Sequence, residues 1–228
     1  MPDRSGDTVT SVTELRVEYH QRLNDIDAAV QRILSLVEQD ILNAGTALLD
    51  ADEKAADAVE ANERIVEESY GRVEQLVVNQ FARQAPVASE LRFLLAVFRI
   101  LPELAASHDR AAQLARRGVT GLAAELPDRV RLLIKELVDA AAEMWRQVSA
   151  VYLSGSAQIA DDTEEDDDEL DELHASLSAE LASTGLRTPV LLEMGVVAAL
   201  LERLGDSAVE IARQIESLSP TRHDDGAR

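Results

Sequence analysis

A stripe of apolar residues at helical spacing runs through the first fifty positions of the chain. Its members recur every three or four residues: Leu15, Tyr19, Leu23, Ile26, Val30, Ile33, Val37 and Ile41. This spacing gathers them on one face of an α-helix, whereas a half-buried strand would need an apolar residue at every second position. The pattern therefore predicts a long bundle helix over about 11–49, followed by a turn or a new helix start at 50–54.

The composition favours helices in the rest of the chain as well. Aromatic residues make up only 3% of the sequence, and 10 glycines and 6 prolines offer few tight turns. β-Sandwiches and β-barrels need more aromatic residues and more tight turns than this sequence offers. We therefore expect helices that pack through small side chains. We expect five further helices, over about 55–83, 86–117, 130–160, 166–182 and 189–218. Pro102 should kink or split the third, because proline removes a backbone hydrogen bond.

The chain contains an internal repeat. Segment 108–117 can be laid over segment 205–214, which places Asp109 on Asp206. A boundary at 118–127, with two glycines and a proline, separates the copies. The predicted fold is all-α, with two tandem three-helix bundles and six helices. The units are 11–118 and 119–218, between a flexible N-terminus (1–10) and a disordered tail (219–228). A long coiled coil is the competing architecture.

The sequence is strongly acidic, and its acidic residues are concentrated in one segment. The formal net charge is -21, and segment 161–172 alone holds ten acidic residues in twelve positions. Nucleic-acid binding needs a basic stripe, so we expect no nucleic-acid partner. No apolar run approaches the roughly 20 residues of a membrane span. We therefore expect no membrane insertion, and a soluble, cytoplasmic protein.

Two pairs of carboxylates are the candidate functional residues. Glu202 and Asp206 lie four positions apart, opposite the apolar stripe of their helix, and Asp167 and Asp171 repeat this spacing on the neighbouring helix. Acid pairs on adjacent helices can converge into an oxygen-rich site for a divalent or trivalent cation. The alternatives are a solvated acidic face and, for Asp167 and Asp171, a flexible acidic run.

Other chemistries have little support in the sequence. The four histidines do not form the Glu-x-x-His pairs of di-iron carboxylate bundles; they are His20, His108, His174 and His223. The chain has no cysteine, and no glycine-rich phosphate loop, catalytic serine pattern or His-Glu-x-x-His motif stands out. We therefore expect a protein that is not an enzyme, and a carboxylate-bridged di-metal oxidase is the most distant alternative.

Three segments resemble a known family. Segment 201–212, Leu-Glu-Arg-Leu-Gly-Asp-Ser-Ala-Val-Glu-Ile-Ala, resembles the Leu-Glu-Arg-Ile-Gly-Asp signature of PhoU-type phosphate-transport regulators. Segment 84–92 is similar to the family's Gln-Pro-Val-Ala-Ser-Asp-Leu-Arg stretch, with one additional alanine, and 59–65 occupies the place of its acidic second helix. The three segments come in the family's order, and the resemblance covers nearly the whole chain.

The resemblance implies a pair of three-helix bundles and a regulatory adaptor without catalytic activity. It implies negative regulation of phosphate uptake and of the phosphate-starvation response, with a phosphate ABC transporter ATPase and a sensor histidine kinase as partners. A homodimer is a further expectation. It also implies metal binding by Glu/Asp-x-x-x-Asp motifs, which match Asp167 with Asp171 and Glu202 with Asp206. The metal would be iron, zinc, magnesium or manganese.

The first repeat departs from the family's acidic pattern. Asn62 and Val66 stand where its second helix would carry acids, and Ala105 replaces the glutamate partner of Asp109. Glu63 and Glu67 would supply the missing acids after a shift of one residue. We therefore expect one principal metal site, in the second repeat, with Asp109, Glu63 and Glu67 as further candidates in the first.

Two other functions fit the same architecture. One is a metal-independent helical docking protein, and the other is an accessory subunit of a different phosphate permease. In either case the acidic run 161–172 would be a candidate surface for a basic partner, because complementary charge speeds and orients association. The alternative for this run is a solvated loop and helix start.

Overall fold

The computed structural model describes residues 5–83 and 88–218, and these fold into helices without any strand. Six α-helices and one short 3-10 helix follow one another along the chain. They are α1 (Ser5–Asp50), α2 (Glu53–Arg83), α3 (Ala88–Gly118), η1 (Leu122–Glu125), α4 (Asp128–Ser154), α5 (Ala157–Ser183) and α6 (Thr188–Leu218). The predicted all-α class and helix number are confirmed.

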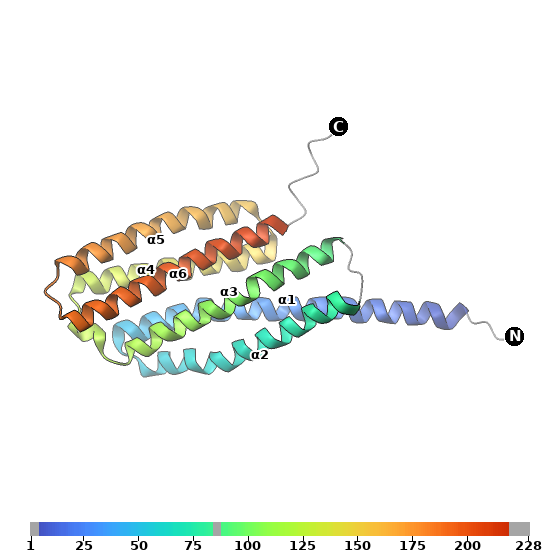
Figure 1. Ribbon diagram of the computed structural model, residues 1–228, viewed down its shortest axis with the longest axis horizontal. Helices are drawn as coiled ribbons and strands as arrows, with labels where there is room; N and C mark the ends of the chain where they lie inside the picture. The colour runs from blue at the N-terminus through green and yellow to red at the C-terminus, as the bar shows by residue number, and fades with distance from the viewer. Residues whose placement is uncertain (1–4, 84–87, 219–228) are drawn as a thin grey trace, which may run out of the picture.

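The helices form two antiparallel three-helix bundles that lie side by side (Figure 1). The first contains α1, α2 and α3, and the second contains α4, α5 and α6. Equivalent helices meet between them, because α1 packs on α4 and α3 packs on α6. The second helix of each bundle, α2 or α5, contacts only its own bundle mates closely and lies at an outer edge. These edges leave the α2–α3 and α5–α6 seams on the outside of the molecule.

The core follows the apolar stripes of the sequence. In α1, the stripe members Ile26, Val30, Ile33, Val37 and Ile41 are almost completely buried. In α4, Trp145 is fully buried and donates its indole N–H to the backbone oxygen of Leu204 in α6, at 2.9 Å. A buried tryptophan needs such a partner for its only donor. None of the described helices carries an apolar stretch long enough to cross a membrane.

The boundary between α4 and α5 differs from the prediction. Gly155 takes a left-handed conformation, with φ of 64°, and its N–H bonds the Val151 carbonyl at 2.7 Å, which ends α4 at Ser154. Ser156 then accepts a hydrogen bond from the Ile159 N–H and caps α5. The predicted helices over 130–160 and 166–182 are therefore wrong at this junction. The acidic run 161–172 belongs to a helix.

Two other local features bear on the expectations. The helix α3 runs unbroken through Pro102, whose ring is exposed, so of the two expected outcomes, a kink or a split, the split does not occur. The helix α1 begins at Ser5, inside the segment expected to be flexible, and its first turns project beyond the bundle (Figure 1). The remaining expectations for the ends, a flexible start at 1–4 and a disordered tail at 219–228, lie outside the described residues.

A glycine allows the C-terminal end of α3 to approach α1 closely. A Cβ atom at Gly118 would overlap the backbone of Ala47 and Leu48 in α1. Backbone atoms in the middle of a packed helix cannot move aside as a flexible side chain can. Glycine is therefore the residue that this crossing requires.

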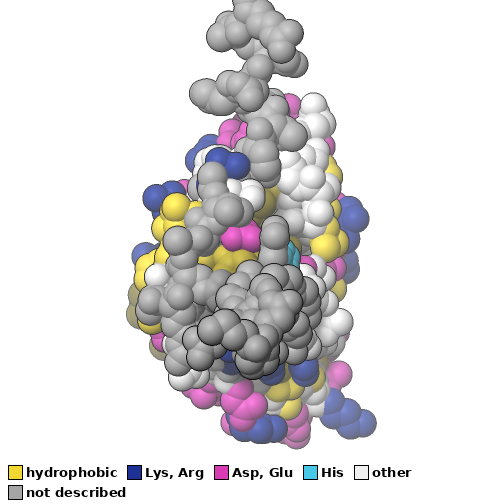
Figure 2. Space-filling view, turned by 90° about the vertical axis from the view of Figure 1, so that its right-hand side faces the viewer, with side chains coloured by type: hydrophobic (Ala, Val, Ile, Leu, Met, Phe, Trp, Pro, Cys, Tyr) yellow, Lys and Arg dark blue, Asp and Glu magenta, His cyan; other side chains and the backbone are white. Residues whose placement is uncertain are grey.

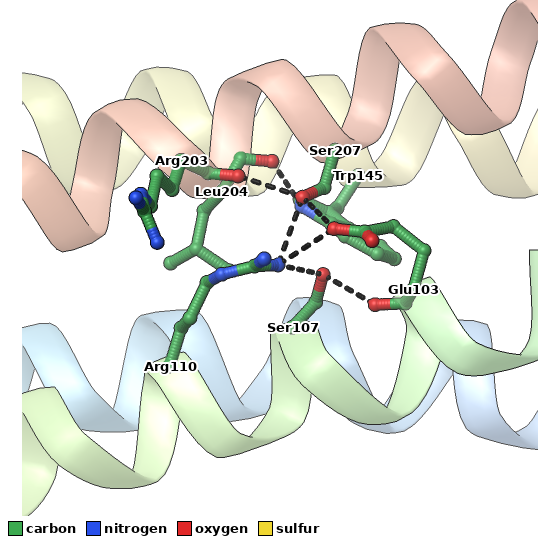
Figure 3. Close-up of polar contacts among 7 residues, drawn as sticks. All are labelled: Glu103, Ser107, Arg110, Trp145, Arg203, Leu204 and Ser207. Carbon is green, nitrogen blue, oxygen red and sulfur yellow. Dashed lines mark hydrogen bonds and ion pairs between the residues drawn. The ribbon is translucent and has the colours of Figure 1, made fainter.

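Polar residues join the two bundles where α3 crosses α6 (Figure 3). Arg110 of α3 donates to Ser207 of α6 at 2.9 Å and to Glu103 at 2.8 Å, and Ser207 donates to the same Glu103 oxygen at 2.5 Å. Burial opposes the charge of Glu103, but the hydrogen bonds from Ser207 and Arg110 outweigh it and lower the pKa of Glu103. In the repeat alignment Arg110 falls on Ser207, so the repeats meet through equivalent positions.

Candidate functional site

The predicted acids of the second repeat lie along the outer seam between α5 and α6. The helix α5 turns Leu170 and Leu177 into the core, which leaves Asp167 and Asp171 on its side toward α6. Gly205 of α6 lets α5 approach closely, because a Cβ at Gly205 would lie 3.1 and 3.2 Å from the methyl carbons of Leu170 and 3.3 Å from Oδ1 of Asp167. The Asp167 carboxylate therefore rests directly against the backbone of α6.

Two of the other predicted residues, Asp171 and Asp206, lie near enough to Asp167 for their charges to affect it. Oδ1 of Asp167 is buried and has no hydrogen-bond partner among the described residues. Burial is the largest cause that raises the pKa of Asp167 to about 6, followed by the charges of Asp171, Asp206 and Asp168, while Arg213 opposes the shift. We call Asp167, Asp171 and Asp206 the acidic seam. The carboxylates of the acidic seam lie near one another, and Arg213 compensates their negative charge only in part.

The fourth predicted residue, Glu202, has a different neighbour. Its Oε1 lies 3.7 Å from Nδ1 of His174 in α5, and both side chains are partly exposed. His174 was not among the predicted site residues, although its position three residues after Asp171 places both on one face of α5. Gly205 was missed as well, because only the packing of α5 on α6 shows what its absent side chain makes possible.

The burial pattern corrects the register of the first repeat. Four buried residues of α2 share their spacing with four buried residues of α5: Val59, Val66, Val73 and Val77 match Thr163, Leu170, Leu177 and Leu181. Gln80 of α2 and Ala160 of α5 are buried as well and lie outside this shared pattern. Val66 is therefore the counterpart of the core residue Leu170, and the assignment of Asn62 and Val66 to acid positions is wrong by one residue. Glu63 and Glu67 are the true counterparts of Asp167 and Asp171.

Next to these acids, the first repeat has a polar network in its core. Asp40 of α1 is fully buried and accepts a hydrogen bond from Nδ2 of Asn62 in α2, at 2.8 Å. Its other oxygen lies 2.8 Å from Nδ1 of His108 in α3, which is only 2% exposed. We call these three residues the core network. It was not predicted, because a single aspartate on an apolar stripe does not reveal its partners.

The two repeats differ in how well they fit a metal ion. The acidic seam has a buried carboxylate oxygen without a partner and a glycine that makes room for it, and carboxylate oxygens suit hard cations. In the first repeat, His108 stands at the position of Gly205 and Ala105 at that of Glu202. Glu63, Glu67 and Asp109 thus lack both the space and the fourth acid, and they do not fit the same site.

The carboxylates of the described residues are not drawn together into a closed coordination shell. No group of three or more His, Cys, Asp or Glu side chains in 5–83 and 88–218 is arranged to hold a metal ion. The carboxylates of the acidic seam therefore do not form a complete metal-coordination site in this structure. A cation that bound there would have to bring the oxygens of α5 and α6 closer together.

The pKa of Asp167 leads to a prediction about pH and stability. Because the folded state raises this pKa from 3.8 to about 6, folded protein holds a proton that unfolded chain releases, and stability should fall as the pH rises across this window. Asp167→Asn should remove this loss, and at pH 7 the variant should be more stable by about 1 kcal/mol, allowing for solvent screening. Urea unfolding from pH 4.5 to 8 in the presence of chelator measures the difference. Parallel curves for the two proteins would contradict the prediction.

The surface elsewhere mixes charges of both signs. Figure 2 looks onto the end from which α1 projects, and magenta acidic side chains alternate there with blue basic ones on the described surface.

On the flank between α4 and α5, by contrast, a groove of about 320 Å³ has mostly acidic walls. Its charged residues are Glu136, Asp139, Glu143, Asp166 and Glu169. The second repeat thus carries acids on both sides of α5.

Comparisons with known proteins agree with this architecture. The family model described as "PhoU domain" matches twice, over 30–118 and 134–215, once for each bundle. A curated relative from Rhizobium meliloti (strain 1021), named "Phosphate-specific transport system accessory protein PhoU homolog", is 24% identical, with 92% of this chain and 90% of the relative covered. "PhoU homolog 1" of Mycobacterium tuberculosis (strain ATCC 25618 / H37Rv) is 29% identical, with 88% and 92% covered.

Solved structures show the same fold. The crystal structure of PhoU from Pseudomonas aeruginosa superposes with a TM-score of 0.81 at 22% identity, covering 88% of this chain and 98% of that one. The PhoU structure from Streptococcus pneumoniae superposes with a TM-score of 0.75 at 16% identity. The two family matches coincide with the two bundles and include both acidic motifs of the second. The chain therefore belongs to the PhoU family.

Proposed function

We propose that this protein is a regulatory adaptor of a phosphate transport system and acts without catalysis. The observation that carries the proposal is the double PhoU-domain match, one for each bundle, together with relatives that are named accessory proteins of phosphate-specific transport. In this proposal the protein restrains phosphate uptake and phosphate-starvation signalling from the cytoplasm. It does so by contacting a phosphate ABC transporter ATPase and a sensor histidine kinase, as a monomer or a homodimer.

The acidic flank of the second repeat is the proposed docking surface. The run 161–172 lies on α5 at the outer edge of the molecule, where the first bundle does not cover it. Together with the groove against α4 it forms one negative surface. Such a surface favours a basic patch on the partner, mainly through the rate and orientation of association.

A binding experiment tests this surface directly. We expect the triple variant Glu165→Gln, Asp168→Asn, Glu172→Gln to bind the purified ATPase or the kinase cytoplasmic region at least about threefold more weakly at low salt, and to lose part of its salt dependence. These side chains are exposed on α5, and the substitutions leave the acidic seam intact. The matched control neutralises three exposed acids of α2, namely Asp57, Glu60 and Glu74. Unchanged binding to both partners by the first variant would exclude the run as a docking surface.

We also propose that the second repeat binds a metal ion through Asp167, Asp171, Glu202 and Asp206. What supports it is the unpartnered Oδ1 of Asp167 and the negative charge that Asp171 and Asp206 add beside it. Iron, zinc, magnesium and manganese are all compatible with carboxylate ligands, and His174 beside Glu202 would favour a transition metal over magnesium. The bound ion would neutralise the negative charge of these carboxylates, whose mutual repulsion otherwise destabilises the folded protein.

Metal analysis of protein purified without chelator tests this assignment. The double variant Glu202→Ala, Asp206→Ala should lose at least about tenfold in metal affinity, since it removes half of the proposed ligands. Replacement of Asp109, the counterpart of Asp206 in the first repeat, by alanine should leave the affinity unchanged. Equal metal content in all three proteins would favour the rival function, a metal-independent docking protein of the same architecture.

A further inference from the structure

All three phenylalanines of the chain lie on α2 and α3, close to the turn that joins these helices, and two of them face solvent. Phe93 packs partly against the core, whereas Phe81 and Phe98 are 38% and 49% exposed. Val78 and Leu91 are exposed to a similar extent. Large apolar side chains that gather on a surface mark interaction sites more often than single ones do. We call Val78, Phe81, Leu91 and Phe98 the apolar patch.

The apolar patch follows the outer seam between α2 and α3. At the opposite end of this seam, Glu60 of α2 and Arg116 of α3 line the same groove. Val78 and Phe98 each lie 18 residues from these two, which is about five full turns and therefore the same face of each helix. Because the helices are antiparallel, Val78 and Phe98 lie opposite each other across the seam. This end of the seam is the one from which α1 projects, and yellow apolar side chains reach the surface there (Figure 1, Figure 2).

The second repeat shows that the fold does not need large apolar side chains at these positions. In the register of the two repeats, the equivalents of the apolar patch are all small or polar: Ala182, Gly185, Thr188 and Gly195. The helices α5 and α6 pack on each other without them. The apolar patch is therefore a property of the first repeat alone.

Two arginines lie beside the apolar patch without an acidic partner. Arg92 and Arg99 follow Leu91 and Phe98 in the chain, and because seven residues make about two turns, they form a basic row next to the apolar row on α3. The side chain of neither forms an ion pair or hydrogen bond within the part of the chain that the structure describes, and Nε of Arg92 is buried.

Other arginines of the chain do find such partners. Eight of them lie within reach of a carboxylate: Arg64, Arg72, Arg110, Arg117, Arg131, Arg146, Arg187 and Arg213. A buried N–H without an acceptor, such as Nε of Arg92, is costly, and a partner that brings an acceptor removes this cost. The basic row is therefore available to carboxylates of another molecule.

The apolar and basic rows match an amphipathic helix that carries acidic residues beside its apolar stripe. An apolar row at two-turn spacing receives the stripe of a second helix, and charged rows next to it select the partner by its charge. Guanidinium groups also suit carboxylates in geometry, because they can bind both oxygens. Glu74 lies one turn before Val78 on the α2 side and would repel acids there. The acids of the partner should therefore lie on the α3 side.

A second copy of this chain fits the surface less well. Its most acidic segment is the run 161–172 of α5, but none of the large apolar side chains of α5, all of whose residues are described, is exposed. Another copy thus offers the charge without the apolar stripe. A membrane of anionic lipids fits less well too, because it would repel a chain with a net charge of -21.

We propose that the apolar patch, together with Arg92 and Arg99, docks an amphipathic acidic helix of a partner protein. This surface belongs to the first repeat, whereas the acidic run 161–172 belongs to α5 of the second. The two surfaces prefer partners of opposite charge, so one molecule can hold two different partners at once. That bridging role rests on the proposed adaptor function, but the docking surface itself does not.

Binding of a synthetic peptide to the full chain tests the surface. The probe is a labelled helical peptide with a leucine stripe flanked on one side by glutamates, and the control probe has the same residues in scrambled order, without a stripe. Fluorescence anisotropy should show at least about tenfold tighter binding of the striped peptide. Both probes carry the same charge, so general repulsion by the acidic chain cancels in this comparison.

Two sets of variants assign the binding to the proposed residues. Leu91→Ser with Phe98→Ser should weaken binding of the striped peptide at least about tenfold, and Phe98→Ser alone, at the more exposed position, at least about fivefold. Arg92→Gln with Arg99→Gln should weaken it about threefold and reduce its salt dependence. Circular dichroism and unchanged urea midpoints confirm that each variant is folded.

The matched control replaces an exposed apolar pair outside the patch. Leu192 and Val196 of α6 are 68% and 39% exposed, and serine at both positions should leave peptide binding unchanged. Equal binding of the striped and scrambled peptides, or unchanged binding after the substitutions at Leu91 and Phe98, would overturn the inference.

Two other results would assign the patch to a different occupant and overturn the inference as well. One is that Phe98→Ser abolishes binding to vesicles of phosphatidylcholine and phosphatidylglycerol but not to the peptide. The other is that it converts a dimer to a monomer in sedimentation, again without an effect on the peptide. The peptide assay contains no component of phosphate transport. Its failure therefore leaves the proposed adaptor function standing, and failure to bind the ATPase and the kinase leaves the docking surface standing.

Discussion

Replacing Asp40 by alanine should lower the free energy of unfolding by about 3 kcal/mol or more. The substitution removes a fully buried carboxylate that Asn62 and His108 both use, and it leaves two desolvated polar groups without their partner. Each such group costs about 1–3 kcal/mol, so the two together account for a loss of about 3 kcal/mol or more. Urea unfolding followed by circular dichroism measures the change.

The control for this experiment is Asp40→Asn, which keeps the shape of the side chain and one acceptor oxygen. Its loss should be clearly smaller, because one of the two contacts can still form. A second control lies outside the core: replacing the exposed Asp109, next to His108 in the sequence, should change stability by less than about 0.5 kcal/mol. A loss below 1 kcal/mol for Asp40→Ala would mean that the core network contributes little.

Replacing Gly118 by alanine should be about as damaging, at about 3 kcal/mol, although it adds only one methyl group. The new Cβ would overlap the backbone of Ala47 and Leu48, so α3 or α1 would have to move. Overpacking of this kind commonly costs about 1–3 kcal/mol, and contact with backbone leaves little room for relaxation. Thermal or urea unfolding provides the measurement.

Gly71 supplies the matched control for Gly118. It lies within α2, and no atom stands within 4 Å of the Cβ that alanine would add there. Gly71→Ala should therefore stabilise the protein by up to about 1 kcal/mol, because alanine is the better helix former. If Gly118→Ala also left stability unchanged or raised it, the close approach of α3 to α1 at Gly118 would not be tight.

The fold could be predicted because it is determined mainly by the regular spacing of apolar residues along each helix. The stripe of α1 and the duplicated segment around Asp109 and Asp206 required amphipathic helices in two similar sets, and packing then leaves few architectures. Helix ends were harder, since they depend on single residues. The left-handed conformation of Gly155 and the cap at Ser156 moved the start of α5 nine residues earlier than expected.

The site was predictable in part, for a physical reason. Carboxylates four residues apart must share a helix face, so the pairing of Asp167 with Asp171 needed no tertiary information, whereas the direction of that face toward α6 did. The register of α2 did need it, because only the burial of Val66 shows which acids correspond to those of α5. The roles of Gly205 and His108 depend on distances between helices. The spacing of residues along one helix does not reveal the distances between that helix and its neighbours.

The contact between Arg110 and Ser207 bears on how such a molecule arises. Two separate but identical chains that meet through the same position must place the same residue there twice, and two arginines would repel each other. A duplicated gene removes this constraint, because each copy can then change alone. Here one copy carries a donor and the other a hydroxyl that accepts from it while also bonding Glu103. The junction between the bundles thus uses an asymmetry that two identical chains could not provide.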